Sequence, residues 1–304
     1  MDNPYLSICI PTYNRLEILR NTLNSIYSDL NDVNMDDFEV VISDNSPDSS
    51  TRGIKEKFNY PNLHYVETKC DGFLNSYFAM TYGKGKYLKL HNNYAKLQKG
   101  TLKNLIDAIK NNMDEKPFFF FTNGEKLKGR VINYFSFDEF MAGLSYYSSW
   151  STGFGMWRSD FEKYKRIELD SMFPQTSLIL TQIYKKKYIL NDCKLFEDQY
   201  IPKKGGYNIF KVFSVGYIRL IKTSFDNGYI SKKTFELIKK DLLYKYISVR
   251  YFKTVIFKLD TFDKDDIKKN ISVYYSCLEY YLMIIISLFT PLRVIIRKIM
   301  RYFK

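Results

Sequence analysis

The sequence predicts an α/β protein with a mostly parallel, doubly wound sheet, followed by a C-terminal helical region. Two observations carry this prediction. Up to about residue 111, short β-branched and apolar runs alternate with segments of helical periodicity, and beyond residue 201 the pattern is helical only. We therefore expect an α/β domain over residues 1–200 and a helical region over residues 201–304.

The first βα unit occupies the start of the chain. The apolar run 6–10 is followed at once by apolar residues at helical spacing, namely Leu16, Leu19, Leu23 and Ile26. In open α/β sheets, ligands bind beyond the carboxyl ends of the strands. The polar turn between the two elements is therefore a candidate binding loop, and it consists of Pro11, Thr12, Tyr13, Asn14 and Arg15.

The following elements continue the alternation. We expect strands at 38–43, 63–66, 86–90, 118–122, 129–135 and 151–157, and helices at 73–82, 101–111, from 136, from 159, and at 175–186. Glycines 83 and 85 end the helix that begins near residue 73, because glycine readily occupies a helix C-terminus.

A polar cluster follows the second strand, over residues 44–51. Asp48, Ser49 and Ser50 are typical of a turn and a helix N-cap, where such side chains satisfy free backbone donors. Asp44 differs, because it stands at the strand's carboxyl edge, beside the first strand's tip if the two strands pair in parallel. A carboxylate there can accept hydrogen bonds from a base or a ribose.

These two segments together resemble a known family. Residues 11–15, followed by residues 43–46, resemble the start of family 2 glycosyltransferases with the GT-A fold, and the likeness extends over about residues 6–190. In that family, the first loop and the aspartate after the second strand hold the nucleoside of a sugar nucleotide. The resemblance thus implies nucleotide-sugar binding by Pro11, Thr12, Tyr13, Asn14, Arg15, Asp44, Asn45, Gly72, Asn75, His91, Asn92 and Asn93.

The end of the fourth strand departs from the family pattern. The family places an aspartate–any–aspartate motif there for a divalent metal, whereas this chain has His91 and Asn93. Histidine is a competent ligand for manganese, and an asparagine carbonyl is a weak one. Three alternatives stay open: Mn²⁺ or Mg²⁺ binds with fewer charges, the enzyme works without metal, or the site is catalytically inactive.

The leaving nucleoside diphosphate develops negative charge, which metal ions or cationic side chains stabilise. Without a metal, Arg15, Lys89 and the segment 203–208 are candidates for that role. The glycines of the segment would let backbone amides approach an anion.

An inverting transferase also needs a base for the attacking hydroxyl, and a carboxylate is the usual choice. By resemblance, the base belongs to residues 168–176, although the usual Glu-Asp pair is missing there. Asp170 is the candidate, with Asp138, Glu139 and Glu168 behind it. An ordinary helix-capping role for Asp170 is the competing interpretation.

Aromatic residues gather on the expected acceptor side, where their faces suit the apolar C–H surfaces of sugars. Burial in the core is the alternative for each one. The Gln-x-x-Arg-Trp signature of processive synthases is missing, which favours addition of a single sugar. The aromatic residues are Tyr146, Tyr147, Trp150, Phe154 and Trp157.

The formal net charge of +13 indicates an anionic partner. Nucleic acid is not expected, because no nucleic-acid-binding signature is found. Four scattered cysteines and the lack of an N-terminal signal-peptide pattern favour the cytoplasm. Residues 271–304 combine an uncharged run with a basic end, which is typical of a membrane-surface segment, although a core helix with a solvated end has the same pattern.

These observations predict an inverting glycosyltransferase that moves one sugar from a nucleoside-diphosphate sugar, with UDP favoured, to a saccharide or lipid-linked acceptor. The setting would be bacterial capsule, O-antigen or surface-glycan synthesis on the inner face of the membrane. The alternative is a catalytically degenerate GT-A protein that binds a nucleotide or scaffolds partner enzymes. A sugar nucleotidyltransferase would require a first loop rich in glycine and arginine, which residues 11–15 are not.

Overall fold

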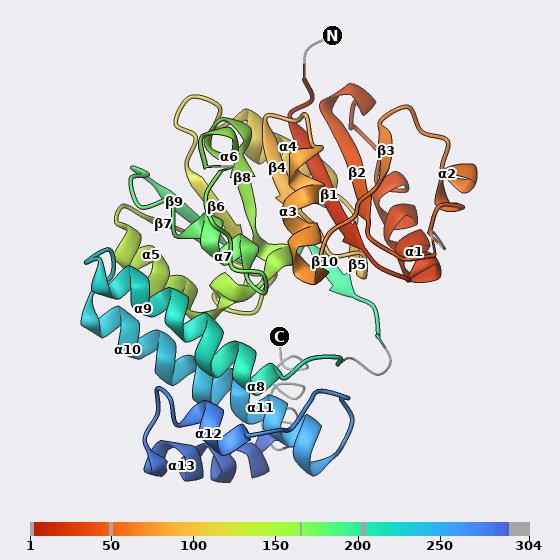
Figure 1. Cartoon of the computed structure of the whole chain (residues 1–304). Helices are drawn as coiled ribbons and strands as arrows, with labels where there is room; N and C mark the ends of the chain where they lie inside the picture. Colours follow the sequence, from red (N-terminus) through yellow and green to blue (C-terminus); the bar gives the residue numbers. More distant parts are fainter. Residues whose placement is uncertain (1–2, 49–50, 165, 202–204, 292–304) are drawn as a thin grey trace. The chain divides into compact units, whose positions relative to one another are not determined.

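The computed structural model describes residues 3–48, 51–164, 166–201 and 205–291. By its internal contacts the chain divides into two compact units, Met1–Tyr200 and Ile201–Lys304. Figure 1 shows that the first unit contains all the strands, whereas the second is built from helices.

The main sheet of the first unit has the strand order β3-β2-β1-β4-β8. Strands β1 (Leu6–Thr12), β2 (Phe38–Asp44), β3 (Leu63–Glu67) and β4 (Tyr87–Leu90) run parallel, and β8 (Gly155–Trp157) pairs antiparallel with β4. Strands β1, β2 and β4 are almost wholly buried, as expected for apolar runs covered on both faces. The predicted α/β class with a mostly parallel sheet is confirmed.

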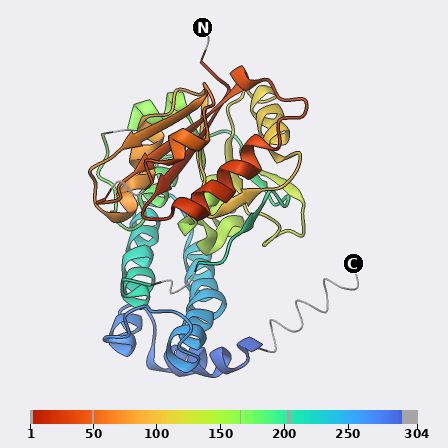
Figure 2. The same cartoon turned by 90° about the vertical axis from the view of Figure 1, so that its right-hand side faces the viewer.

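Helices cover both faces of this sheet. Helices α1 (Leu16–Tyr27) and α4 (Thr101–Lys110) pack on the face that carries Ile8 and Ile10. Helix α3 (Asn75–Thr81) packs on β1 and β2 from the other side, and Figure 2 shows the red and yellow helices opposite the orange one. The alternation of side chains along a strand explains this arrangement, because successive residues face opposite sides.

The rest of the first unit surrounds this core. A second sheet has the order β6-β9-β7, and a short ribbon pairs β5 with β10. The bounds are β5 Ala95–Leu97, β6 Phe118–Phe121, β7 Val131–Tyr134, β9 Tyr188–Asn191, β10 Phe196–Asp198, α2 Ile54–Lys57, α5 Phe137–Leu144, α6 Arg158–Tyr164 and α7 Pro174–Ile179, with 3₁₀ turns η1 Met35–Asp37, η2 Gly72–Leu74, η3 Ser145–Ser149 and η4 Ser151–Gly153.

Several sequence predictions need correction here. The helix expected at 175–186 ends at Ile179, and the segment expected as a strand over 151–157 begins with the 3₁₀ turn η4. The strands β5, β9 and β10 were not predicted. The capped helix start at Ser136 is confirmed, since its side chain accepts a hydrogen bond from the amide of Glu139.

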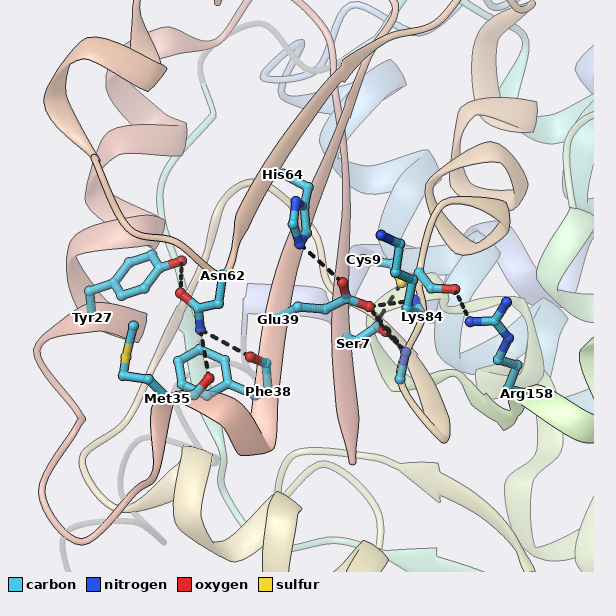
Figure 3. A network of polar contacts seen from close by, with 12 residues as sticks. Ser7, Cys9, Tyr27, Met35, Phe38, Glu39, Asn62, His64, Lys84 and Arg158 are labelled. Carbon is cyan, nitrogen blue, oxygen red and sulfur yellow. Dashed lines mark hydrogen bonds and ion pairs between the residues drawn. The ribbon is translucent and has the colours of Figure 1, made fainter. Parts of the chain in front are cut away.

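A buried carboxylate secures the amino-terminal edge of the main sheet (Figure 3). Glu39 of β2 accepts hydrogen bonds from Ser7 Oγ (2.6 Å) and from the backbone amides of Gly85 (3.0 Å) and Lys84. His64 Nε2 lies 3.3 Å from the other oxygen of Glu39. Gly85 is required at this turn, because a Cβ there would lie 2.6 Å from the nitrogen of Ser7.

The second unit consists of α-helices and π-helical segments in its described residues 205–291. They are α8 Ile209–Lys211, η5 Val212–Tyr217, α9 Ile218–Asp226, α10 Lys232–Asp241, η6 Leu242–Ile247, α11 Ser248–Tyr251, η7 Phe252–Ile256, α12 Ile267–Ile271 and α13 Cys277–Leu288. Among the described residues, none of the helices has the length and apolar character needed to cross a membrane.

Candidate functional site

The carboxyl ends of β1, β2 and β4 meet at one edge of the main sheet. Thr12 at the end of β1 is aligned with Asp44 at the end of β2, and the amide of His91 donates to the carbonyl of Cys9 at 2.9 Å. Parallel pairing therefore gathers the loops after these three strands, as the alternating pattern of the sequence predicts.

Asp44 is buried and held in one orientation by its neighbours. Its Oδ1 accepts a hydrogen bond from the amide of Ser46 (2.9 Å), and its Oδ2 accepts one from the hydroxyl of Tyr65 (2.5 Å). The pKa of Tyr65 lies above its ordinary value, mainly because the hydroxyl is buried and secondly because of this hydrogen bond to Asp44. Tyr65 therefore remains protonated and keeps donating to the carboxylate.

Ser46 joins the first two loops. The amide of Asn14 donates to Ser46 Oγ at 2.7 Å, and Ser46 Oγ donates in turn to Asp44. Asn14 has a φ of 47°, a left-handed conformation that asparagine tolerates better than most residues. Its neighbour Tyr13 is 53% exposed, so the tyrosine ring is accessible to a ligand that binds next to the loop after Asp44. Pro11 and Arg15 are half-buried, and Arg15 immediately precedes α1.

Asn75, at the start of α3, connects the ends of β1 and β2. Its Nδ2 lies within hydrogen-bond distance of the carbonyls of Thr12 (3.1 Å) and Ser43 (2.9 Å) and of Asn45 Oδ1 (2.9 Å). Its Oδ1 accepts a hydrogen bond from Ser43 Oγ at 2.7 Å. A buried amide with these partners holds both strand ends against the helix.

The loop between β3 and α3 also joins this region. Asn45 Nδ2 donates to the carbonyl of Cys70 at 3.3 Å, two residues before Gly72. Gly72 has a φ of +43°, a conformation in which a side chain would be strained. The structure thus brings the loop of Gly72 to the side of Asn45.

Two of the three residues after β4 contact the same edge. Asn93 Nδ2 donates to Thr12 Oγ1 at 2.8 Å, and the Asn93 carbonyl accepts from Thr22 of α1. Asn92 Oδ1 accepts from Ser151 Oγ at 2.9 Å, which links β4 to the turn η4. Thr12, Asn45, Asn75 and Asn93 are therefore connected by hydrogen bonds, and Asp44 precedes Asn45 directly; we call these five residues the strand-end cluster.

His91 has other partners. Its Nε2 lies 2.5 Å from the carbonyl of Ala95, so this nitrogen carries the proton, and its ring packs edge-on against Phe196. Burial, together with the nearby charge of Lys89, lowers the pKa of His91 to about 3. His91 also lines a small cavity with Lys89 and apolar side chains such as Ile8, Leu105 and Leu195.

The predicted metal pair is not assembled by this geometry. Metal binding through His91 Nε2 would break its bond to Ala95, and the Asn93 amide is engaged with Thr12. Among the described residues, no group of three or more His, Cys, Asp or Glu side chains could hold a metal ion. The residues present do not fit a preformed divalent-metal site, and we derive no chemical step through a metal.

The cationic candidates for the diphosphate also need revision. Lys89 is buried and donates to the carbonyls of Leu90 (2.9 Å) and Thr152, so it holds β4 to η4 instead of facing a ligand loop. Burial lowers its pKa to about 7. In the segment 203–208, Lys203 and Lys204 lie outside the described residues, and Asn208 caps α8 in the second unit. Arg15 remains the candidate at the strand-end cluster.

Asp170 caps the turn that leads into α7. Its Oδ1 accepts hydrogen bonds from the amides of Met172 (2.9 Å) and Phe173 (3.1 Å). Gln175 links α7 to η3, because its Nε2 donates to the carbonyl of Ser149 at 2.7 Å. Residues 145–153 of η3 and η4 thus connect α7 with Asn92, because Ser151 bonds to that side chain.

The expected acceptor-side aromatic residues divide into two sets. Phe154 and Trp157 are buried core residues, and Trp157 Nε1 donates to the carbonyl of Pro117 at 2.7 Å, so their expected role as sugar platforms is corrected. Tyr146 and Tyr147 stack at 4.8 Å and are only half-buried, as is Trp150. Only this second set could contact an acceptor.

Sequence reasoning missed Tyr65 and Ser46 as partners of Asp44. A usable signal existed for Tyr65, because it stands two residues before the β3 position aligned with Asp44. Such diagonal neighbours on adjacent strands are within reach of a long aromatic side chain.

Comparisons with known proteins agree with this architecture. The family model described as Glycosyl transferase family 2 matches residues 7–165, which is more than half of the chain. No curated protein matches the chain. The strand-end cluster lies within the matched residues.

Several solved structures share the fold. S. aureus TarS 1-349 in complex with UDP-GlcNAc has a TM-score of 0.58 at 17% identity, over 88% of this chain and 78% of that one. The mannosyltransferase PcManGT from Pyrobaculum calidifontis, in complex with GDP-Man and Mn²⁺, has a TM-score of 0.57 at 15% identity, over 96% and 83%. The longer S. aureus TarS chain is covered over only 43% of its length, with a TM-score of 0.53 at 16% identity.

Proposed function

The chain belongs to glycosyl transferase family 2, as its motifs predicted, and from this premise we propose that it transfers one sugar from a nucleoside-diphosphate sugar with inversion. A uridine nucleotide is the favoured donor. Structures of TarS contain UDP or UDP-GlcNAc, and that of PcManGT contains GDP-Man, which supports a nucleotide-sugar donor here. The observation that carries the proposal is the Asp44 carboxylate, held at the sheet's carboxyl edge by Ser46 and Tyr65.

The strand-end cluster offers suitable groups for a nucleoside. Asp44 accepts hydrogen bonds, so it can bind a base N–H or a ribose hydroxyl when a ligand displaces the hydroxyl of Ser46. The exposed ring of Tyr13 can stack on the base. Asn45, Asn75, Asn92 and Asn93 supply neutral polar groups around the donor, and Gly72 permits close approach of the backbone.

The diphosphate requires positive charge as it leaves. Arg15 follows the first loop directly, and a guanidinium can bind phosphate oxygens in a bidentate manner. We propose Arg15 for this role. The PcManGT structure contains Mn²⁺, so the use of a divalent metal by this chain is also to be tested. His91 and Asn93 are the metal ligands that the sequence predicts.

Asp170 is the proposed general base for the acceptor hydroxyl. A base must come within hydrogen-bond reach of the proton that it removes. The Asp170 Oδ1 is engaged with two backbone amides, so the reaction would require a small rearrangement of the turn before α7.

We propose a saccharide or lipid-linked acceptor in bacterial capsule, O-antigen or surface-glycan synthesis. The protein would work in the cytoplasm, peripherally on the inner face of the membrane. The sequence supports this setting with a basic segment, although its cations lie outside the described residues; they are Arg293, Arg297, Lys298, Arg301 and Lys304.

One observation favours a second function. His91, Asn92 and Asn93 stand where the family has metal-binding carboxylates, and His91 is engaged with Ala95. A nucleotide-binding subunit without catalysis would have no need for those charges. This candidate predicts nucleotide binding without donor turnover.

Thermal unfolding with UDP, GDP and CDP, each with and without Mn²⁺, tests the donor class. A ligand that binds only the folded state raises the unfolding temperature, so UDP is expected to stabilise the protein. Absence of any shift at millimolar concentrations of all three nucleotides would contradict the proposal. The ± Mn²⁺ arms show whether the metal contributes to binding.

Hydrolysis of UDP-sugars separates the two functions. Turnover by the wild type that is lost in Asp170→Asn supports the enzyme. Asp107→Asn is the control, because Asp107 lies on the solvent side of α4 in an ion pair with Lys103. Nucleotide binding with no turnover of any donor or acceptor tried would favour the binding subunit.

A further inference from the structure

Helix α13 exposes an apolar face. Its outward residues recur at the spacing of one helix side, and their exposed fractions range from 42% to 78%. Single exposed apolar residues are ordinary, but a continuous stripe along one helix marks a binding surface. We call this surface the α13 stripe; it consists of Leu278, Tyr281, Leu282, Ile285, Leu288 and Phe289.

The opposite side of α13 is already used for folding. Tyr280, Met283 and Ser287 are buried, and the helix packs on α11 within the second unit. Apolar residues therefore occupy both sides of α13. A helix of that kind is stable only when both sides are covered, so the α13 stripe calls for a partner.

Lys268 contacts the α13 stripe, and the sequence that follows α13 is basic. Helix α12 lies beside α13 (Figure 1). Lys268 Nζ of α12 donates to the hydroxyl of Tyr281 at 3.2 Å and lies 5.1 Å from the centre of its ring. The sequence from 280 to 304 contains five basic residues and no acidic one. The nearby carboxylates are Glu279, which forms the capping box with Ser276 at the start of α13, and Asp266, which lies 3.7 Å from Lys269.

We propose that α13 lies flat in the headgroup region of an anionic bilayer, with the α13 stripe facing the acyl chains. The helix has 12 residues, about 18 Å, which is too short to cross a hydrocarbon core of about 30 Å. Apolar residues immersed beside lysine and tyrosine are typical of interfacial helices. This inference rests on the proposed function, because a lipid-linked acceptor gives the transferase a reason to bind the membrane.

A second copy of the chain is the competing occupant. A twofold contact would bring together two chains that each carry a formal net charge of +13. Anionic lipid instead neutralises positive charge. Charge therefore favours the bilayer.

Sedimentation of the full chain with vesicles tests the proposal. We expect binding to phosphatidylcholine vesicles that contain phosphatidylglycerol, weaker binding without the anionic lipid, and weaker binding at high salt. Ile285→Glu should reduce binding by roughly tenfold or more, because an exposed apolar contact is replaced by a charge that lipid repels. Leu237→Glu on α10 is the matched control, since Leu237 is also an exposed apolar helix residue, and it should bind as the wild type does.

Equal binding by wild type and Ile285→Glu would overturn the proposal, as would no binding to either vesicle. A wild-type dimer that Ile285→Glu dissociates, without vesicle binding, would assign the α13 stripe to a second copy and also overturn it. Both variants change exposed positions, and circular dichroism checks that they fold.

A second measurement does not depend on weakening the contact. Tyr281→Trp should show a blue shift of the added tryptophan emission when anionic vesicles are present, relative to the wild-type spectrum. An unshifted emission despite sedimentation would place the contact elsewhere and overturn the proposal. UDP-induced stabilisation is measured separately in Ile285→Glu, so failure of the donor proposal and failure of lipid binding give different results.

Discussion

The two ends of strand β2 each carry a buried carboxylate, and the two are held differently. Glu39 at the amino end is 3% exposed, and Asp44 at the carboxyl end is 2% exposed. Glu39 accepts two backbone amides of the turn before β4 and the hydroxyl of Ser7. Asp44 accepts side-chain hydroxyls from Ser46 and Tyr65 in addition to one amide.

This difference separates a structural carboxylate from a candidate ligand-binding one. Backbone amides cannot turn away without breaking the turn, so these two partners of Glu39 are permanent, and its hydroxyl partner Ser7 is fully buried. A serine hydroxyl can rotate, so a ligand can take the place of Ser46 on Asp44 at little cost. Burial of an acid at a strand end therefore does not by itself identify a site; the kind of hydrogen-bond partner does.

The largest expected effect is from Glu39→Ala. Removing this carboxylate leaves Ser7 Oγ and the Lys84 amide without their acceptor, and the Gly85 amide keeps only Ser7 Oγ at 2.7 Å, so the free energy of unfolding should fall by about 3 kcal/mol. Urea denaturation measures the change. Glu67→Gln is the control, because its ion pair with Arg52 is exposed and should contribute less than about 1 kcal/mol. Equal losses in the two variants would contradict a special role for Glu39.

The second prediction concerns stability at acid pH and His91, which follows the carboxyl end of β4. The pKa of His91 is about 3 in the folded protein and 6.5 ordinarily, so between these values the unfolded state binds the extra proton. The contribution of His91 is complete above pH 6.5 and is lost as the pH falls toward 3. From pH 7 to 5 the free energy of unfolding should fall by about 2 kcal/mol from this residue. His91→Asn should flatten the profile measured by urea denaturation, and an unchanged slope would show that His91 is protonated when folded.

The third prediction sharpens the contrast at Asp44. Asp44→Asn should weaken UDP binding about tenfold or more, because an amide nitrogen would face donors that the carboxylate accepts. Calorimetric titration measures the affinity, and the variant should lose only about 1 to 2 kcal/mol of stability. Retained affinity would move the nucleoside away from Asp44.

The smallest effect is expected from Tyr65→Phe. This change keeps the ring and removes the hydroxyl that orients Asp44. Loss of one such hydrogen bond corresponds to about 1 kcal/mol, so UDP affinity should fall about fivefold. Tyr60→Phe is a suitable control, since Tyr60 precedes the start of β3 and its ring stacks on Tyr27 at 3.8 Å. If UDP affinity fell in Tyr60→Phe and not in Tyr65→Phe, the proposed role of Tyr65 in orienting Asp44 would be refuted.

The sequence by itself determined the parallel sheet and the edge at which the candidate residues gather. Apolar runs and helical spacing are local patterns, so they predicted β1, α1, β2 and β4 within a few residues. The order of polar residues after each strand then indicated Asp44 and the loop after β1, because parallel strands end at the same edge.

Only the tertiary structure decided which side chains at that edge contact one another. Strands β5 and β10 pair across about a hundred residues, and their pairing brings Phe196 against His91. Ala95 at the start of β5 supplies the carbonyl that engages His91 Nε2. The contacts of a side chain at a strand end depend on partners that are distant in the sequence, such as Phe196 for His91. The local periodicity of apolar residues does not identify those partners.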